Sequence, residues 1–524
     1  MPAAKNAYYA LSNPLSMLLD KPAQGFQRKD LLRVIAEKGI ERITFHYAGL
    51  DSKLKELKIP VVSPLQAETI LAEGERVDGS SIFKGMVDMG LSDLYVVPVY
   101  RTAFLNPFDD KSLDFICRYF TKDGILAPFA PDNILANAAS LLEKTAGLEL
   151  RALGELEFYV LFEKGKSLYP ARRQRGYHAS SPFVKSGPIL NEMLHHIAQL
   201  TGAVKYAHSE VGFIDSVQSD VEELKDKRAE QMEIELLPRP VADMADDVVL
   251  ARWLIRNIAY RHGLTATFTP KLEEGVAGSG MHFHLELRRD GRNILVGPDG
   301  RLSTEARRLI GGLCEYADSL TAFGNTVASA YLRLVPNQEA PTRICWSDLN
   351  RSALIRVPLG WANLPNLAHI LNPQENEAFR PGDSRQTVEL RSPDGSASIH
   401  LLLAGMAMAA EWGFRDEPSV LFPGALPLEL AERLYVQGNI FADPELLMRL
   451  PSLPPSCVAS GRLLLEKRGL YEREGIFPPS VIGYMAKQLQ AEDDEFLNAK
   501  ILARPADDRQ NEIHRIMHKD IHKH

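Results

Sequence analysis

Two carboxylates stand two residues apart near the middle of this chain of 524 residues. Glu155 and Glu157 fall in the segment 155–162, which has the pattern of a β-strand, so both side chains point to the same face. Carboxylates that close repel each other. Two interpretations follow: the face is solvated, or a cation lies between the two side chains.

Two imidazoles repeat this spacing. His282 and His284 follow the glycine-containing run 278–280, and Phe283 between them points to the opposite face of a predicted strand over 282–287. The pair is either two core histidines or part of a site. A third pattern puts Glu389 and Arg391 on one side of a predicted strand over 387–391, where a surface salt bridge would also explain them.

Three arginines, Arg333, Arg351 and Arg356, flank the polar stretch 337–341. Such arginines are either solvated or bind carboxylate and phosphate oxygens through paired N–H donors. The acids and imidazoles form an oxygen-rich ligand set without cysteine, which favours Mg²⁺ or Mn²⁺ over zinc. No Walker or dinucleotide glycine motif is present, so a nucleotide would be held otherwise. These residues predict a metal-dependent enzyme acting on anions and do not choose the reaction.

Composition excludes several classes of protein. With 45% hydrophobic and 24% charged residues and a net charge of −8, the chain is globular and has no basic face for nucleic acid. Its longest apolar run, 401–410, is far shorter than the roughly 18 residues of a membrane helix. Residues 1–19 lack the pattern of a secretory signal, so a cytoplasmic location is expected. Four well-separated cysteines are expected to be reduced and buried: Cys117, Cys314, Cys345 and Cys457.

The elements that must position these residues mix strands and helices irregularly. Up to about Pro128 the pattern predicts a small sheet with one helix, over 29–38 and ending at Gly39. A helix from Pro131 to Gly147 opens a larger domain. Further helices are predicted over 188–200, 246–262, 304–323 and 399–411, with further strands over 264–269 and 293–296. Because strands and helices do not alternate regularly, the predicted class is α+β.

Six ordered blocks of the chain together resemble the glutamine synthetase family over about residues 30–490. They are 77–81 (Val-Asp-Gly-Ser-Ser), 154–158 (Gly-Glu-Leu-Glu-Phe), 278–284 (Gly-Ser-Gly-Met-His-Phe-His), 339–341 (Glu-Ala-Pro), 350–353 (Asn-Arg-Ser-Ala) and 389–394 (Glu-Leu-Arg-Ser-Pro-Asp). The resemblance implies a β-grasp domain, 28–128, followed by a catalytic domain with a curved antiparallel sheet and flanking helices, 129–503. An N-terminal extension, 1–27, and a C-terminal tail, 504–524, complete the chain.

The same resemblance implies roles for individual residues. Glu157, Glu210 and Glu233 would hold a first divalent ion, and Glu155, His282 and Glu389 a second. His284, Arg351 and Arg356 would bind ATP, and Arg333, Arg391 and the backbone of Gly278 would bind glutamate. An ammonium pocket would consist of Asp78, Tyr177, Glu210 and Glu339, with Asp78 coming from a neighbouring subunit and Glu339 taking the excess proton. The family's hexameric rings, single or stacked, are therefore expected, with no nucleic acid or membrane partner.

The implied reaction is ATP-dependent ligation of ammonia to the γ-carboxylate of L-glutamate through a γ-glutamyl phosphate. Some residues depart from the family pattern: Ala277 replaces an Asn that holds glutamate, Gln338 replaces a Tyr, and Glu286 puts an acid near the nucleotide. A polar stretch, 216–228, is inserted between Glu210 and Glu233. A γ-glutamyl ligase for an organic amine, such as methylamine, a polyamine or an aromatic amine, remains an alternative. A catalytically silent structural relative is a second alternative.

Overall fold

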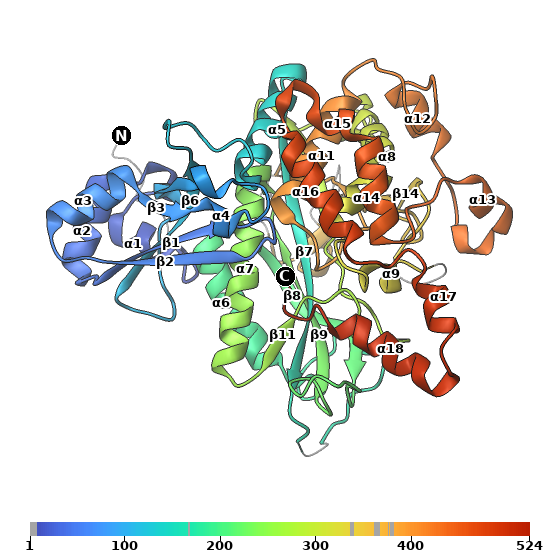
Figure 1. Ribbon diagram of the computed structural model, residues 1–524, viewed down its shortest axis with the longest axis horizontal. Coiled ribbons are helices and arrows are strands. Elements are labelled where there is room, and N and C mark those ends of the chain that lie inside the picture. The colour runs from blue at the N-terminus through green and yellow to red at the C-terminus, as the bar shows by residue number, and fades with distance from the viewer. Residues whose placement is uncertain are drawn as a thin grey trace.

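The computed structural model describes residues 8–165, 168–335, 340–360, 367–375, 377 and 382–523. An N-terminal domain lies on one side of the long strand β7 (Glu149–Phe162), and the C-terminal helices lie on the other (Figure 1). Strands and helices mix in both domains. The predicted α+β class is therefore confirmed.

The N-terminal domain is a mixed sheet with strand order β2-β1-β6-β4-β3. Its elements are α1 (Pro14–Leu19), α2 (Arg28–Lys38), β1 (Arg42–Ala48), β2 (Leu54–Pro60), α3 (Pro64–Glu73), β3 (Glu75–Asp78), α4 (Gly79–Ile82), β4 (Asp93–Pro98), β5 (Phe104–Leu105) and β6 (Ser112–Phe120). β1 and β6 pair in parallel, and the other pairs are antiparallel. The expectation of a single helix here was wrong. The helix α3 begins after Ser63, whose side chain accepts a hydrogen bond from Gln66 N, and Pro64 is its first residue. The helix is short and its apolar residues are not concentrated on one face, so the sequence pattern did not indicate it.

The second domain is built on a large sheet with strand order β14-β15-β16-β12-β7-β9-β8. Its strands are β7, β8 (Val204–Ile214), β9 (Arg228–Leu236), β10 (Arg239–Pro240), β11 (Thr265–Thr267), β12 (Phe283–Arg289), β13 (Arg292–Asn293), β14 (Trp346–Asp348), β15 (Ile355–Val357) and β16 (Val388–Leu390). β14 and β15 pair in parallel, and all the other strand pairs of this sheet are antiparallel.

Helices pack on this sheet and on one another. They are α5 (Pro131–Ala146), α6 (Gly187–Thr201), α7 (Val241–Arg261), α8 (Thr304–Gly324), α9 (Ala330–Arg333), α10 (Leu367–Leu371), α11 (Ile399–Gly413), α12 (Pro427–Arg433), α13 (Pro444–Arg449), α14 (Cys457–Glu466), α15 (Arg468–Glu472), α16 (Pro479–Gln490), α17 (Leu497–Leu502) and α18 (Ala506–His518). α18 shows that the predicted tail contains a helix. The domain boundaries proposed at residues 28, 129 and 504 stay predictions.

Element boundaries depart from the sequence pattern where pairing is long-range. β7 starts at Glu149 rather than Glu155, because its first half pairs with β12 and only its second half pairs with β9. β11 covers only part of the predicted strand over 264–269, and β12 starts one residue after His282. The local pattern carries no information about a partner strand more than a hundred residues away along the chain.

Two expectations from composition can be compared with the structure. All four cysteines are free and buried, as predicted. Among the described residues, no helix has the length and apolar character needed to cross a membrane. The cytoplasmic location stays a prediction.

The helices α8 and α11 pack in close contact at Gly312 of α8. α11 is buried along its whole length, and a Cβ added at Gly312 of α8 would lie 1.9 Å from the carbonyl oxygen of Ala409. Real side-chain atoms do not approach a carbonyl that closely. The contact between these two helices therefore depends on the missing side chain.

We expect Gly312→Ala to lower the thermal unfolding midpoint, because the two helices must separate at a cost of about 1–3 kcal/mol or more. Gly483→Ala is the matched control, because Gly483 lies inside α16 and a Cβ added there would meet only open space. Better helix propensity should leave that variant as stable as the wild type or up to about 1 kcal/mol more stable. Equal midpoints for both variants would contradict the packing argument.

Candidate active site

The site is built on alternate residues of β7. Leu156 and Phe158 are fully buried in the core, so Glu155 and Glu157 emerge together on the opposite face. The two carboxylates do not face bulk water, since the side chain of Glu155 is only 15% exposed and burial raises the pKa of Glu157. The interpretation of a solvated face is therefore wrong.

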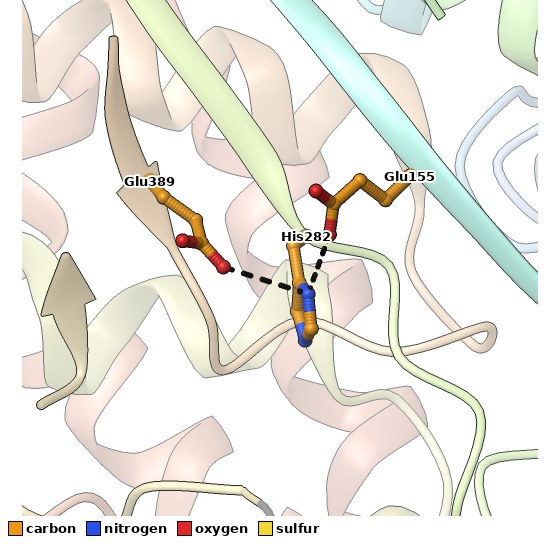
Figure 2. Close-up of side chains that lie close together, drawn as sticks. All are labelled: Glu155, His282 and Glu389. Atoms are coloured by element: carbon orange, nitrogen blue, oxygen red, sulfur yellow. Dashed lines mark hydrogen bonds and ion pairs between the residues drawn. The ribbon is translucent and has the colours of Figure 1, made fainter. Parts of the chain in front are cut away.

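Glu155 contacts both imidazoles that the sequence pattern singled out. Its Oε2 lies 2.8 Å from Nδ1 of His282, and its Oε1 lies 2.9 Å from Nε2 of His284. Oε1 of Glu389, from β16, lies 3.6 Å from the same Nδ1 of His282 (Figure 2). Glu155, His282 and Glu389 thus offer ligand atoms that all lie within 4.8 Å of one another.

Neighbouring imidazole and guanidinium groups favour the ionised form of two of these acids. Burial opposes ionisation of Glu155, but His284 and His282 outweigh it and hold the pKa of this carboxyl well below its usual range. Glu389 is 2% exposed, and its pKa is also lowered against the effect of burial, by His284 and His282 among other groups. Arg356 Nη1 donates to Glu389 Oε2 at 2.8 Å, and Arg391 Nε donates to Glu389 Oε1 at 3.1 Å.

A second group of ligands comes from β8 and β9. His208, Glu210 and Glu233 have ligand atoms within 4.8 Å of one another, and His208 Nε2 lies 3.1 Å from Glu233 Oε2. Burial and the surrounding carboxylates, Glu155 and Glu157 foremost, raise the pKa of Glu233 to about 11. A buried acid with so many acidic neighbours lacks compensating positive charge.

Glu157 lies between the two groups with different partners. Its Oε2 accepts from the backbone N–H of Gly280 at 2.7 Å and from Nε2 of Gln231 at 3.3 Å. Burial raises the pKa of Glu157, although His282 and Arg333 oppose the shift. Of the expected set of Glu157, Glu210 and Glu233, the last two share a group of close ligand atoms with His208, and the assignment of Glu157 to the same ion stays a prediction.

These donors fit hard divalent cations. They are carboxylate oxygens and imidazole nitrogens without sulfur, the set that suits Mg²⁺ or Mn²⁺. Glu235 adds a further observation, because it is 2% exposed and its Oε2 has no hydrogen-bond partner. With Glu155 and His284 it forms another group of close ligand atoms.

A cavity of about 490 Å³ opens beside these acids. Its lining includes Glu157, Glu210, Gln231, Ala277, Gly278, His282, Arg333, Arg351 and Arg391. Arg333 is fixed by a hydrogen bond from Nη1 to the carbonyl oxygen of Ser392 at 3.0 Å. A Cβ at Gly278 would lie 2.5 Å from the carbonyl oxygen of Pro270, so only glycine fits there. The cavity lining therefore combines carboxylates with guanidinium groups.

Other candidate residues lie apart from the cavity lining. Asp78 is exposed at the end of β3, where its carboxylate accepts from the Ser80 and Ser81 hydroxyls. Tyr177 is 50% exposed, and its ring stacks on His178 with a centroid distance of 4.2 Å. Gln338 and Glu339 lie outside the described residues.

Glu286, which departs from the family pattern, and Thr387 both have local partners. Glu286, the unexpected acid, accepts from Arg288 Nε at 2.6 Å, and Arg151 Nε lies 3.5 Å away. Its charge is therefore compensated. Thr387 Oγ1 lies 2.9 Å from Nδ1 of His284 and so helps to fix that ring.

Sequence reasoning missed His208, Gln231 and Glu235. Gln231 donates to both Glu157 and the carbonyl oxygen of Gly278, and it shares a face of β9 with Glu233 and Glu235. Alternation along 231–235 was the available signal, as it was for His208 and Glu210.

Comparison with known proteins agrees with this layout. Residues 39–122 match the family model of the glutamine synthetase β-grasp domain, and residues 129–421 match that of the glutamine synthetase catalytic domain. A glutamine synthetase of Frankia alni is 31% identical over 426 residues, covering 74% of this chain and 81% of the relative. One of Aquifex aeolicus is 27% identical over 498 residues, covering 89% of this chain and 95% of the relative.

Solved structures share the fold. A glutamine synthetase of Plasmodium falciparum aligns with a TM-score of 0.70 at 20% identity, covering 92% of this chain and 98% of the other. A structure described as apo GmaS aligns with a TM-score of 0.68 at 20% identity, covering 92% and 99%. The β-grasp and catalytic domains expected from the six sequence blocks are confirmed. The chain belongs to the glutamine synthetase family.

Proposed function

We propose that this chain ligates ammonia to the γ-carboxylate of L-glutamate at the expense of ATP, giving glutamine, ADP and phosphate through a γ-glutamyl phosphate. The observation that carries the proposal is the convergence of acids and imidazoles from β7, β8, β9, β12 and β16 beside a cavity that also bears arginines. A ligase of this type must bring two anionic substrates together, and positively charged groups beside each of them are needed to offset their repulsion.

The arginines support the placing of the two anionic substrates. Arg333 and Arg391 are both 8% exposed and line the cavity, so their donors are suited to a carboxylate such as that of glutamate. Arg351 and Arg356, with His284, would bind the phosphates of ATP. Arg391 donates to the carbonyl oxygen of Arg351, which couples the two proposed subsites.

Two divalent ions would be held by the groups around Glu155 and Glu233. When bound, they would offset the repulsion among the carboxylates and polarise phosphate oxygens. The protein's part is to hold the ligands in position: β7 and β9 pair directly, so the carboxylates of Glu157 and Glu233 start from opposed residues of one ladder.

The amine would enter near Tyr177, Glu210 and Glu339, with Asp78 supplied by a neighbouring subunit of a hexameric ring. The exposed position of Asp78, in the N-terminal domain and away from the cavity lining of its own chain, supports this arrangement. Glu339 would remove the proton that ammonium must lose before it attacks the activated carbonyl.

An organic amine as acceptor is the alternative that a specific observation favours. Tyr177, His178 and His208 form a cluster of rings: Tyr177 stacks on His178, and the ring centroids of His178 and His208 lie 4.2 Å apart in a tilted arrangement. The ring centroid of Tyr206 lies 5.7 Å from that of His208. Aromatic faces attract ammonium groups that carry carbon substituents, and Ala277 leaves more room in the glutamate loop than the Asn of the family. A silent structural relative is disfavoured, because the crowded acids destabilise the fold unless cations bind.

Mn²⁺ binding to the metal-free protein at pH 8 should release protons. Glu233 has a pKa of about 11 in the folded protein, so it is protonated at pH 8 and must lose its proton to become a ligand. Affinity should therefore rise with pH. Calorimetric titration in two buffers of different ionisation enthalpy measures the protons released, and Glu233→Gln should reduce their number. Equal apparent enthalpies in both buffers would count against the assignment.

An amine panel separates the proposed reaction from its alternative. With glutamate present, ATP turnover should be faster with ammonium than with methylamine, putrescine or an aromatic amine, each at its saturating concentration. Faster turnover with any organic amine would replace the proposed acceptor. Glutamate-independent or absent turnover with every amine would refute both ligase assignments.

Mixing two inactive variants tests the shared site. In rings formed from equal amounts of Asp78→Ala and Glu389→Gln chains, about a quarter of the sites should combine an intact Glu389 with an intact Asp78 from the neighbour. Activity should return to about that fraction of the wild type. No recovery in mixed rings that have formed normally would show that Asp78 does not serve a neighbouring site.

A further inference from the structure

The C-terminal helix α18 lies against the loop 270–280, part of which lines the cavity. His518 is 2% exposed, and its Nε2 lies 2.9 Å from the carbonyl oxygen of Leu272. Because a carbonyl oxygen only accepts, Nε2 carries the proton and donates. His514, one turn earlier, places its Nε2 2.9 Å from Oε1 of Glu273. α18 thus holds two consecutive residues of the loop.

The strand β11 and the residues just after it are tied to the same part of the tail. Thr269 Oγ1 donates to the carbonyl oxygen of Met517 at 3.1 Å, and Thr267 Oγ1 donates to that of Ile521 at 3.0 Å. Both threonines are buried, at 2% and 0% exposure. A buried hydroxyl that loses its acceptor costs free energy, so these bonds fix the end of α18 firmly.

The connection between β8 and β9, which contains most of the inserted stretch 216–228, joins the same contact. One small core cluster combines residues of the connection, the loop and the tail, among them Val217, Leu224, Leu272, Val276 and Ile521. At its edge, Glu223 Oε1 accepts from Thr265 Oγ1 at 2.7 Å, and Glu223 Oε2 lies 2.7 Å from His522 Nε2. Insertion and tail therefore form one packed unit.

The loop 270–280 transmits this support to the cavity. Ser279 N donates to the carbonyl oxygen of Pro270 at 3.0 Å, which closes the loop on itself. Tyr159 hydroxyl donates to the carbonyl oxygen of Ala277 at 2.7 Å. Ala277 and Gly278 line the cavity. A displacement of Leu272 and Glu273 would thus move the backbone that faces the cavity.

We propose that α18 and the connection 215–227 act as a platform that sets the position of Ala277 and Gly278, and with it the affinity for the amino-acid substrate. His514 and His518 are positioning residues in this platform and do not line the cavity. The inference rests on the proposed function only in placing glutamate next to Gly278.

His518→Ala is the principal test. It should raise KM for glutamate about tenfold, the effect of losing roughly one hydrogen bond, and leave KM for ATP within about twofold. Amide hydrogen exchange over 276–280 should become faster. His518→Gln, whose amide can still donate to Leu272, should restore part of both properties. Arg515→Ala is the matched control, because Arg515 is exposed on the same helix and bonds to Glu512.

Thr269→Val is a second variant, in which the side chain keeps nearly the same shape. It should also raise KM for glutamate and make amide hydrogen exchange over 276–280 faster. Unchanged exchange at 276–280 in His518→Ala and Thr269→Val, or equal increases in KM for glutamate and ATP, would overturn the inference. If the wild type shows no glutamate-dependent turnover, the proposed function fails. The exchange of the loop in the same variants still decides whether the platform exists.

Discussion

Repulsion between carboxylates held on one sheet face is the constraint on which the rest of the site depends. Glu155 and Glu157 leave β7 on the same side, and Glu233 faces them from β9. The pKa values of Glu155 and Glu233 are shifted in opposite directions. Glu155 has two imidazoles beside it and a lowered pKa, whereas Glu233 has one imidazole, His208, and several acids beside it, and its pKa is raised. The arrangement is stable as a charged site only with further positive charge among the acids.

The surrounding fold supplies the stiffness that such a site requires. Side chains of β7 that point away from the site are buried in the core, and the helices behind it pack so closely that α8 and α11 meet at glycine. Arg356 and Arg391 hold Glu389 from two sides, so its carboxylate has little freedom. Groups fixed in this way before substrates arrive need not reorganise during the reaction, which is a main source of catalytic electrostatics.

The sequence predicted the parts of the site that are local. Residues two apart on a strand share a face, and this rule sufficed for Glu155 with Glu157, for the two imidazoles and for Glu389 with Arg391. The family resemblance added Glu210 and Glu233. Their approach could not be read from spacing, because Glu210 lies where the register of β8 and β9 shifts at a bulge.

The remaining gaps have the same origin. Alternation along one strand can place His208 with Glu210 and Glu235 with Glu233, but the ligand groups that they enter depend on which strands pair. The early start of β7 follows from its pairing with β12. The tail was predicted only as a separate segment, since its docking depends on buried hydroxyls and carbonyls that no periodicity reveals. What the sequence lacks in each case is the identity of a distant partner.

Anomalous diffraction from crystals equilibrated with Mn²⁺ tests the central claim most directly. Two strong peaks are expected, one among Glu155, His282 and Glu389 and one beside Glu210 and Glu233. Well-ordered side chains at both positions without a peak, or a peak only at surface acids, would contradict the account of a charged site completed by cations.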